Sequence, residues 1–113
     1  MKNEKGLLSG STTLLILSLL SDGDKYGYEM AEELARKSDH TFVLKEGTLY
    51  PLLHTLEKDK LVTSYTKETD SGRQRKYYKL TDEGRSQLTR KTEEWKLFSE
   101  KINAVIGITS CLN

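Results

Sequence analysis

The sequence predicts a mainly α-helical chain that contains one β-hairpin, an α+β fold. Three observations support this class. Apolar residues recur at helical spacing over residues 9–58, the pattern changes to β-prone runs over residues 61–80, and a seven-residue apolar repeat follows. A chain of 113 residues is expected to form one unit, which we divide into residues 1–81 and a C-terminal helix in residues 82–113.

Two helices are predicted in the first third of the chain. Residues 9–20 hold a dense leucine block whose spacing suits either a helix or a strand, and its length favours the helix. In residues 27–38, Met30 and Leu34 lie four positions apart among charged residues. That spacing predicts a short amphipathic helix, and its acidic start and basic end suit the helix dipole.

A third helix is predicted over residues 47–58, where leucines form a single stripe. The stripe consists of Leu49, Leu52, Leu53 and Leu56. Pro51 is tolerated cheaply only in the first turn of a helix, where the N–H groups lack partners. We therefore expect this helix to begin near Glu46 or Gly47.

A β-hairpin is predicted from two β-prone runs, residues 61–66 and 74–80, on either side of the turn signal Asp70-Ser71-Gly72. The region of its tip carries three cations close together, Arg73, Arg75 and Lys76. Tyr77 and Tyr78 point to opposite faces of the second strand, so one packs inward and the other can reach a phosphate with its hydroxyl. Of the two, Tyr78 is the candidate contact.

A last helix is predicted to begin with Thr81 as its N-cap and with acidic residues in its first turn. Apolar side chains then follow a heptad repeat that Lys91 interrupts once. The repeat comprises Leu88, Trp95, Phe98, Ile102 and Val105. So small a domain cannot bury this seam internally, whereas a symmetric homodimer would bury it.

The net charge of +1 excludes a protein that grips nucleic acid by bulk charge. Residues 45–80, however, carry eight basic and five acidic side chains, which is compatible with a local basic surface. The longest apolar run, residues 14–20, is broken by Ser18 and is too short to span a bilayer. We expect a cytoplasmic protein without a membrane segment.

No pattern in the sequence indicates catalysis, a cofactor or a metal. The single cysteine, Cys111, excludes an intramolecular disulfide and a cysteine-based zinc site. His40 and His54 lie on different predicted elements and have no third ligand at a useful spacing. Neither a nucleophile–base pair nor a phosphate-binding glycine loop is recognisable. The prediction is a binding protein that is not an enzyme.

Three helices followed by a hairpin and a long helix are the element order of a winged helix-turn-helix with an added helix. In that geometry the third helix enters the major groove of DNA, and the hairpin, or wing, reaches the backbone or an adjacent groove. The third helix offers a polar face for base edges, and the wing offers cations for phosphates. The predicted DNA contacts are Lys45, Thr48, Tyr50, His54, Arg73, Arg75, Lys76 and Tyr78.

Three stretches resemble the PadR family of bacterial transcriptional regulators. They are Tyr26-Gly27-Tyr28-Glu29, LKEGTLYPLL at residues 44–53 and GRQRKYYKLTDEG at residues 72–84. The resemblance covers about residues 7–100, and the short tail is similar to the smaller subfamily with a single C-terminal helix. It implies a homodimeric repressor whose first and last helices form the dimer, and which a small-molecule or stress signal releases from double-stranded operator DNA.

Two interpretations of Trp95 remain open. It is either a large residue of the dimer seam or a platform for an effector. The second follows from the resemblance, because multidrug-binding members of that family stack flat aromatic ligands on a tryptophan at this place in the last helix. Phe98, one turn away, would add aromatic surface to the same site.

An alternative function is a winged helix that binds another protein and has lost DNA binding. The cations of the wing argue against it, because such a module has no need of them.

Overall fold

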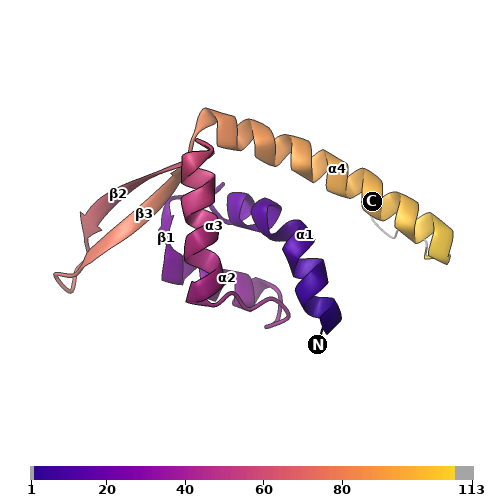
Figure 1. The fold of residues 1–113 in the computed structure, drawn as a ribbon, viewed down its shortest axis with the longest axis horizontal. Helices are drawn as coiled ribbons and strands as arrows, with labels where there is room; N and C mark the ends of the chain where they lie inside the picture. The colour runs from indigo at the N-terminus through magenta and orange to yellow at the C-terminus, as the bar shows by residue number, and fades with distance from the viewer. Residues whose placement is uncertain (1, 109–113) are drawn as a thin grey trace.

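The structure is a computed structural model that describes residues 2–108, with side chains from residue 11 onward. Within this part, the helices lie to one side of a small sheet whose hairpin projects outward, and the last of the four helices extends away from the body (Figure 1). The predicted α+β class, a winged helix-turn-helix with an added C-terminal helix, is confirmed. The elements are α1 (Lys2–Leu19), β1 (Lys25–Tyr26), α2 (Gly27–Lys37), α3 (Glu46–Lys58), β2 (Val62–Glu68), β3 (Gln74–Leu80) and α4 (Asp82–Ile106).

The helices agree with their predicted spans except at the start of the chain. There α1 begins at Lys2, seven positions before the predicted boundary at residue 9. The third helix begins at Glu46, as expected, but Pro51 lies in its second turn. The expectation that Pro51 falls in the first turn is therefore wrong. Because proline has no N–H, the carbonyl of Gly47 lacks the donor that an ordinary residue would supply there.

The sheet has the strand order β1-β3-β2, and both pairs are antiparallel. The hairpin of β2 and β3 was expected, whereas β1 was not, because two residues carry no recognisable alternation. In β1, Lys25 pairs with Tyr78 and Tyr26 pairs with Tyr77. This short strand anchors the base of the wing at the N-terminus of α2.

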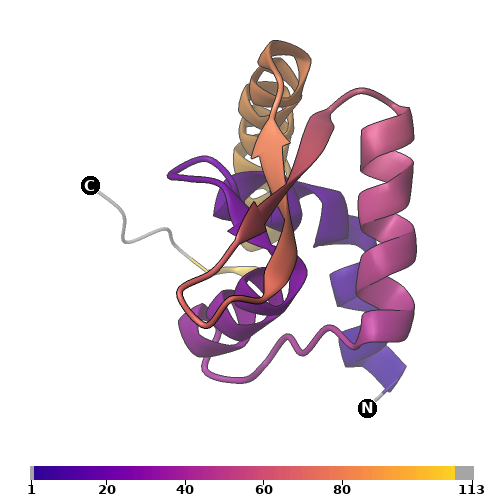
Figure 2. The same cartoon turned by 90° about the vertical axis from the view of Figure 1, so that its left-hand side faces the viewer.

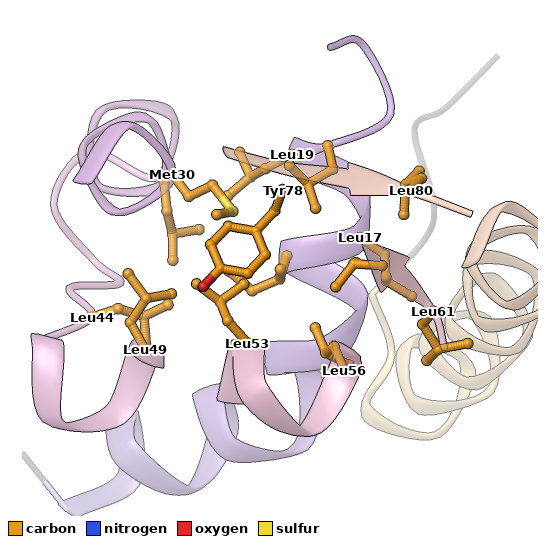
Figure 3. Close-up of a cluster of buried hydrophobic side chains, with 14 residues drawn as sticks. Leu17, Leu19, Met30, Leu44, Leu49, Leu53, Leu56, Leu61, Tyr78 and Leu80 are labelled. Carbon is orange, nitrogen blue, oxygen red and sulfur yellow. The ribbon is translucent and has the colours of Figure 1, made fainter. Parts of the chain in front are cut away.

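The core lies between α1, α2, α3 and the inner face of the sheet (Figure 3). Three leucines of the predicted stripe are buried, and Leu52 is packed against them at the margin. The buried residues are Ile16, Leu17, Leu19, Leu20, Met30, Leu34, Leu44, Leu49, Leu53, Leu56, Leu61, Val62, Tyr78 and Leu80. The third helix therefore has the apolar inner face that its leucine spacing predicted.

Tyr78 belongs to this core and is 4% exposed. Figure 3 shows its ring pointing into the leucine cluster, and burial raises the pKa of its hydroxyl. The strand alternation thus turns Tyr78 inward and Tyr77 outward. The candidate DNA contact at Tyr78 is wrong, because the wing needs this side chain to pack against the helices.

The last helix begins as predicted. The Thr81 hydroxyl accepts a hydrogen bond of 2.9 Å from the Gly84 N–H and donates one of 2.7 Å to the Lys60 carbonyl. This cap joins the start of α4 to the turn between α3 and β2. The helix ends at Gly107, whose φ of 83° is the left-handed conformation that favours glycine. Cys111 and the end of the predicted unit 82–113 lie outside the described residues.

Candidate DNA-binding surface

The third helix packs against the core with one face and exposes polar side chains on the other. The leucines face the core, while Thr48, Tyr50 and His54 are exposed on the other side. Lys45, at the N-cap position, is also exposed. Figure 2 shows α3 standing beside the hairpin, so both predicted DNA-contacting elements border one side of the molecule. The structure thus leaves the four predicted contacts of α3 accessible.

Tyr50 is only partly free, because its ring packs against the start of α2. A Cβ atom at Gly27 would lie 2.7 Å from the Tyr50 hydroxyl oxygen and 2.8 Å from a ring carbon. Only glycine leaves room for the ring in this position. The side chain nevertheless remains 43% exposed. Gly27 therefore positions an exposed tyrosine of α3, a relation that the sequence motif around Tyr26 did not reveal.

The predicted wing cations do not form one cluster. Arg73 lies in the turn next to Gly72, whose φ is 83°, and is exposed. Arg75 is half-buried and Lys76 is exposed, and the strand directs them to opposite faces of the sheet. The wing consequently presents cations at its tip and on both faces.

Arg75 stacks on an aromatic cluster on the outer face of the sheet. We call this cluster the wing-base cluster, and it consists of Tyr26, Tyr65 and Tyr77. The Arg75 guanidinium lies 4.7 Å from the centre of the Tyr26 ring. The Tyr77 ring is 5.4 Å from that of Tyr26, edge to face, and 5.7 Å from that of Tyr65, stacked. Such contacts fix the direction of a long cationic side chain.

Two cations oppose each other across this face. Lys67 and Arg75 are cross-strand partners, an arrangement that is normally unfavourable for like charges. Lys67 lies 5.3 Å from the centre of the Tyr77 ring, as Arg75 lies over Tyr26. The tyrosine rings offset the repulsion and keep two positive charges on the wing. The Nε of Arg75 is buried and makes no hydrogen bond within the described residues.

The inner face joins the wing to α3 through Glu57. The Ser64 hydroxyl donates a hydrogen bond of 2.6 Å to Glu57 Oε2, and Lys76 Nζ lies 3.8 Å from Glu57 Oε1. Sequence reasoning missed Glu57 as a part of this surface. Alternation along β3 places Lys76 on the same face as Tyr78, and the register adds Ser64 to that face. The inward direction of Tyr78 was needed to tell that this face meets α3.

Lys25 holds the turn between α1 and α2. Its ammonium donates hydrogen bonds of 2.7 Å to the Leu19 carbonyl and 2.6 Å to Asp22 Oδ1, and it lies 3.5 Å from Glu33 Oε1. Burial acts to lower the pKa of Lys25, but the hydrogen bond to Asp22 and the charges of Glu33 and Asp22 raise it overall. The same hydrogen bond lowers the pKa of Asp22. Tyr65 makes a separate bond of 2.7 Å to Asp24, which raises the pKa of the tyrosine.

The last helix carries an exposed apolar stripe. The exposed fractions are 49% for Trp95, 58% for Phe98, 44% for Ile102 and 85% for Val105. Leu88, by contrast, is half-buried against the core of its own chain. The uncovered part of the predicted seam therefore begins at Trp95. The Trp95 and Phe98 rings lie 5.9 Å apart and are tilted by 39°.

Within residues 2–108, no grouping of His, Cys, Asp and Glu has the geometry to hold a metal ion. No helix in the described part of the chain is long and apolar enough to cross a bilayer.

Comparison with known proteins decides the family. The model of the transcriptional regulator PadR-like family matches residues 16–90, from the end of α1 to the first turns of α4. The chain belongs to the PadR-like family of transcriptional regulators. Regulation through DNA binding follows from this membership, and proteins of the PadR-like family are generally not enzymes. They are typically dimers.

Individual PadR-like relatives cover most of the chain. Transcriptional regulator Rv3488 of Mycobacterium tuberculosis is 37% identical over 94 residues, which are 83% of this chain and 81% of that protein. Among solved structures, a transcriptional regulator of Clostridium thermocellum matches with a TM-score of 0.79 and 39% identity, covering 88% of this chain and 96% of that one. A PadR-like transcriptional regulator of Bacillus cereus matches with a TM-score of 0.80 and 35% identity, covering 89% and 96%.

Proposed function

We propose that this chain is a homodimeric repressor that binds double-stranded operator DNA and is released by a small-molecule effector. The observation that carries the proposal is the surface formed by α3 and the wing. Thr48, Tyr50 and His54 are exposed on α3, and the exposed Lys76 of the wing reaches Glu57 on the same helix. Base edges would be read by α3, and phosphates would be held by the wing.

A titration against the duplex upstream of its own gene tests DNA binding. We expect tight binding whose logarithm falls linearly with the logarithm of salt concentration, because cations that meet phosphates release counterions. A protein-interaction module without DNA binding would show no such binding at low salt. That result would remove the proposed function.

The exposed stripe on α4 supports the homodimer. Contiguous apolar surface of this kind on a monomer marks an interaction site, and a helix seam with heptad spacing packs well against another helix. A twofold-symmetric pair would also present two copies of α3 to two half-sites on DNA. Trp95, Phe98, Ile102 and Val105 would form the centre of that interface, with Leu88 at the edge nearest the core of each chain.

The aromatic pair on α4 supports an effector site at the same seam. Trp95 and Phe98 offer tilted rings against which a planar aromatic molecule would stack. Ligand bound between the protomers would change the relative tilt of the two α3 helices and spoil their match to the half-sites. Because the chain has one tryptophan, quenching of its fluorescence by planar aromatic cations reports on this site directly. If the dimer leaves no gap there, quenching will be absent and Trp95 is structural.

A further inference from the structure

Glu57 is the one carboxylate that contacts both strands of the wing from α3, among the contacts of the described residues. It lies in the last turns of α3 and is half-buried. One oxygen accepts the hydrogen bond from Ser64 on β2 at 2.6 Å, and the other faces Lys76 on β3 at 3.8 Å. A single side chain therefore links the helix predicted to read bases to the hairpin predicted to hold phosphates.

The two contacts differ in strength. The charge-assisted hydrogen bond of 2.6 Å is short, with its acceptor on α3 and its donor on β2. The ion pair between Glu57 and Lys76 is long, and because the side chain of Lys76 is 57% exposed, water screens the attraction between the two charges. The bond to Ser64 can persist while Lys76 moves to another anion. Lys76 also lies 5.6 Å from the centre of the Tyr78 ring, which limits the directions it can take.

The position of Glu57 also determines how much charge the wing offers to DNA. While Lys76 faces Glu57, part of its charge is offset, and a phosphate that approaches Lys76 competes with the carboxylate. A duplex that seats α3 in its groove would bring phosphates to Lys76 and make the exchange favourable. A duplex whose groove does not accommodate α3 would gain less when Lys76 leaves Glu57 for a phosphate, because α3 makes few contacts with that duplex.

We propose that Glu57 is a specificity-determining residue, which aligns the wing with α3 through Ser64 and withholds Lys76 from DNA that does not fit α3. This inference rests on the proposed DNA-binding function. It concerns the ratio of affinities for matched and unmatched duplexes rather than the affinity for either one.

The test uses the full chain and two duplexes of equal length and composition. One is the tightest-binding sequence selected from a random pool, and the other is its scrambled version. In Glu57→Gln the amide oxygen still accepts the Ser64 hydroxyl, but the charge that faces Lys76 is gone. We expect affinity for the scrambled duplex to rise about threefold, and its salt slope to steepen by about 0.9 per phosphate that Lys76 newly meets. Affinity for the selected duplex should change less.

Two further variants separate this effect from net charge and from unfolding. Glu68→Gln removes the same charge from an exposed position on β2, whereas the ion pair of Lys76 among the described residues is with Glu57. Glu57→Gln combined with Lys76→Gln should abolish the gain that Glu57→Gln produces alone, whereas any effect of Glu68→Gln should survive in the Lys76→Gln background. Thermal denaturation checks that each variant is folded.

The outcomes are distinguishable. A gain that persists without Lys76, or an equal loss of affinity for both duplexes, overturns the role of Glu57 while the DNA-binding function stands. If the unaltered chain binds neither duplex at low salt, the proposed function fails, and the specificity role fails with it.

Discussion

The ring of Tyr50 on α3 lies against the backbone of Gly27 at the start of α2. A side-chain carbon at Gly27 would come within 2.7 Å of the Tyr50 hydroxyl oxygen. The two residues are far apart in the sequence, yet the absence of a side chain at one determines where the other can lie. The tyrosine is a predicted DNA contact and is partly exposed, so it can be displaced without disrupting the core.

We therefore expect Gly27→Ala to weaken operator binding without destabilising the fold. The far end of the Tyr50 side chain would swing away from the new methyl group, because it is the flexible partner of the two. Affinity should fall by about as much as in Tyr50→Ala, roughly fivefold if one hydrogen bond to DNA disappears. Thermal denaturation should show a midpoint close to that of the unaltered protein. An unchanged affinity in both variants would remove Tyr50 from the DNA-binding residues.

Gly84 is a second position that requires glycine, and here the close neighbour is backbone. A Cβ atom at Gly84 would lie 2.1 Å from the Leu61 carbonyl oxygen, and hydrogen bonds through Thr81 tie the start of α4 to Leu61. Gly84→Ala should destabilise the fold by about 3 kcal/mol or more, as severe overpacking does. Gly47→Ala is the matched control, since a Cβ there meets nothing within 4 Å. A similar denaturation midpoint for the two variants would contradict the prediction.

The long helices and strands could be predicted from the sequence because each has a local signal. Leucine spacing defined α3, the glycine turn defined the hairpin, and Thr81 defined the start of α4. The strand β1 could not be found in this way, because two residues show no period and their pairing with β3 is long-range. The early start of α1 was missed because the leucine block begins well inside the helix.

The sequence predicted which residue types form the candidate surface but not which way their side chains point. Charge and order in the sequence identified the cations of the wing, and alternation along the strand separates Arg75 from Lys76, but only the register and packing of the sheet show which of them faces the helices. The same register turns Tyr78 into the core, which local alternation alone left undecided. Glu57 was overlooked because its partners lie on β2 and β3, and an acidic residue gave no reason to expect a role near DNA.

Arg75→Ala tests whether the wing meets phosphates. We expect weaker operator binding and a salt slope that is flatter by about 0.9 for each phosphate that the wing no longer neutralises. The fold should be little affected, because removal of Arg75 also relieves its repulsion with Lys67. Lys79→Ala removes an equal charge from an exposed position nearer the base of the hairpin and should leave the slope unchanged. A slope that Arg75→Ala does not alter would count against binding of DNA by the wing.

The ion pair at Lys25 should make stability depend on pH at both extremes. The pKa of Lys25 is raised in the folded state, so its contribution is fully present below about pH 10.4 and is lost as the pH rises through the raised value. The pKa of Asp22 is lowered, so its contribution is present above about pH 3.9 and is lost as the pH falls. The difference in denaturation midpoint between the unaltered protein and Lys25→Met should therefore be largest near neutrality and shrink towards both extremes. Lys79→Met provides the control, and a difference that does not vary with pH would exclude the ion pair as its source.

Ile102→Asp tests the apolar stripe on α4 as the dimer seam. Ile102 is 44% exposed in the single chain, so a carboxylate at this position stays hydrated in a monomer and leaves the fold intact. In a dimer that uses this stripe the same carboxylate would be buried against apolar side chains of the partner, where desolvation opposes association. We expect light scattering coupled to size exclusion to give the mass of a dimer for the unaltered chain and of a monomer for Ile102→Asp. Ala104→Asp places the same charge about 200° further around the helix and should remain dimeric. A monomeric Ala104→Asp beside a dimeric Ile102→Asp would move the interface to the other side of α4.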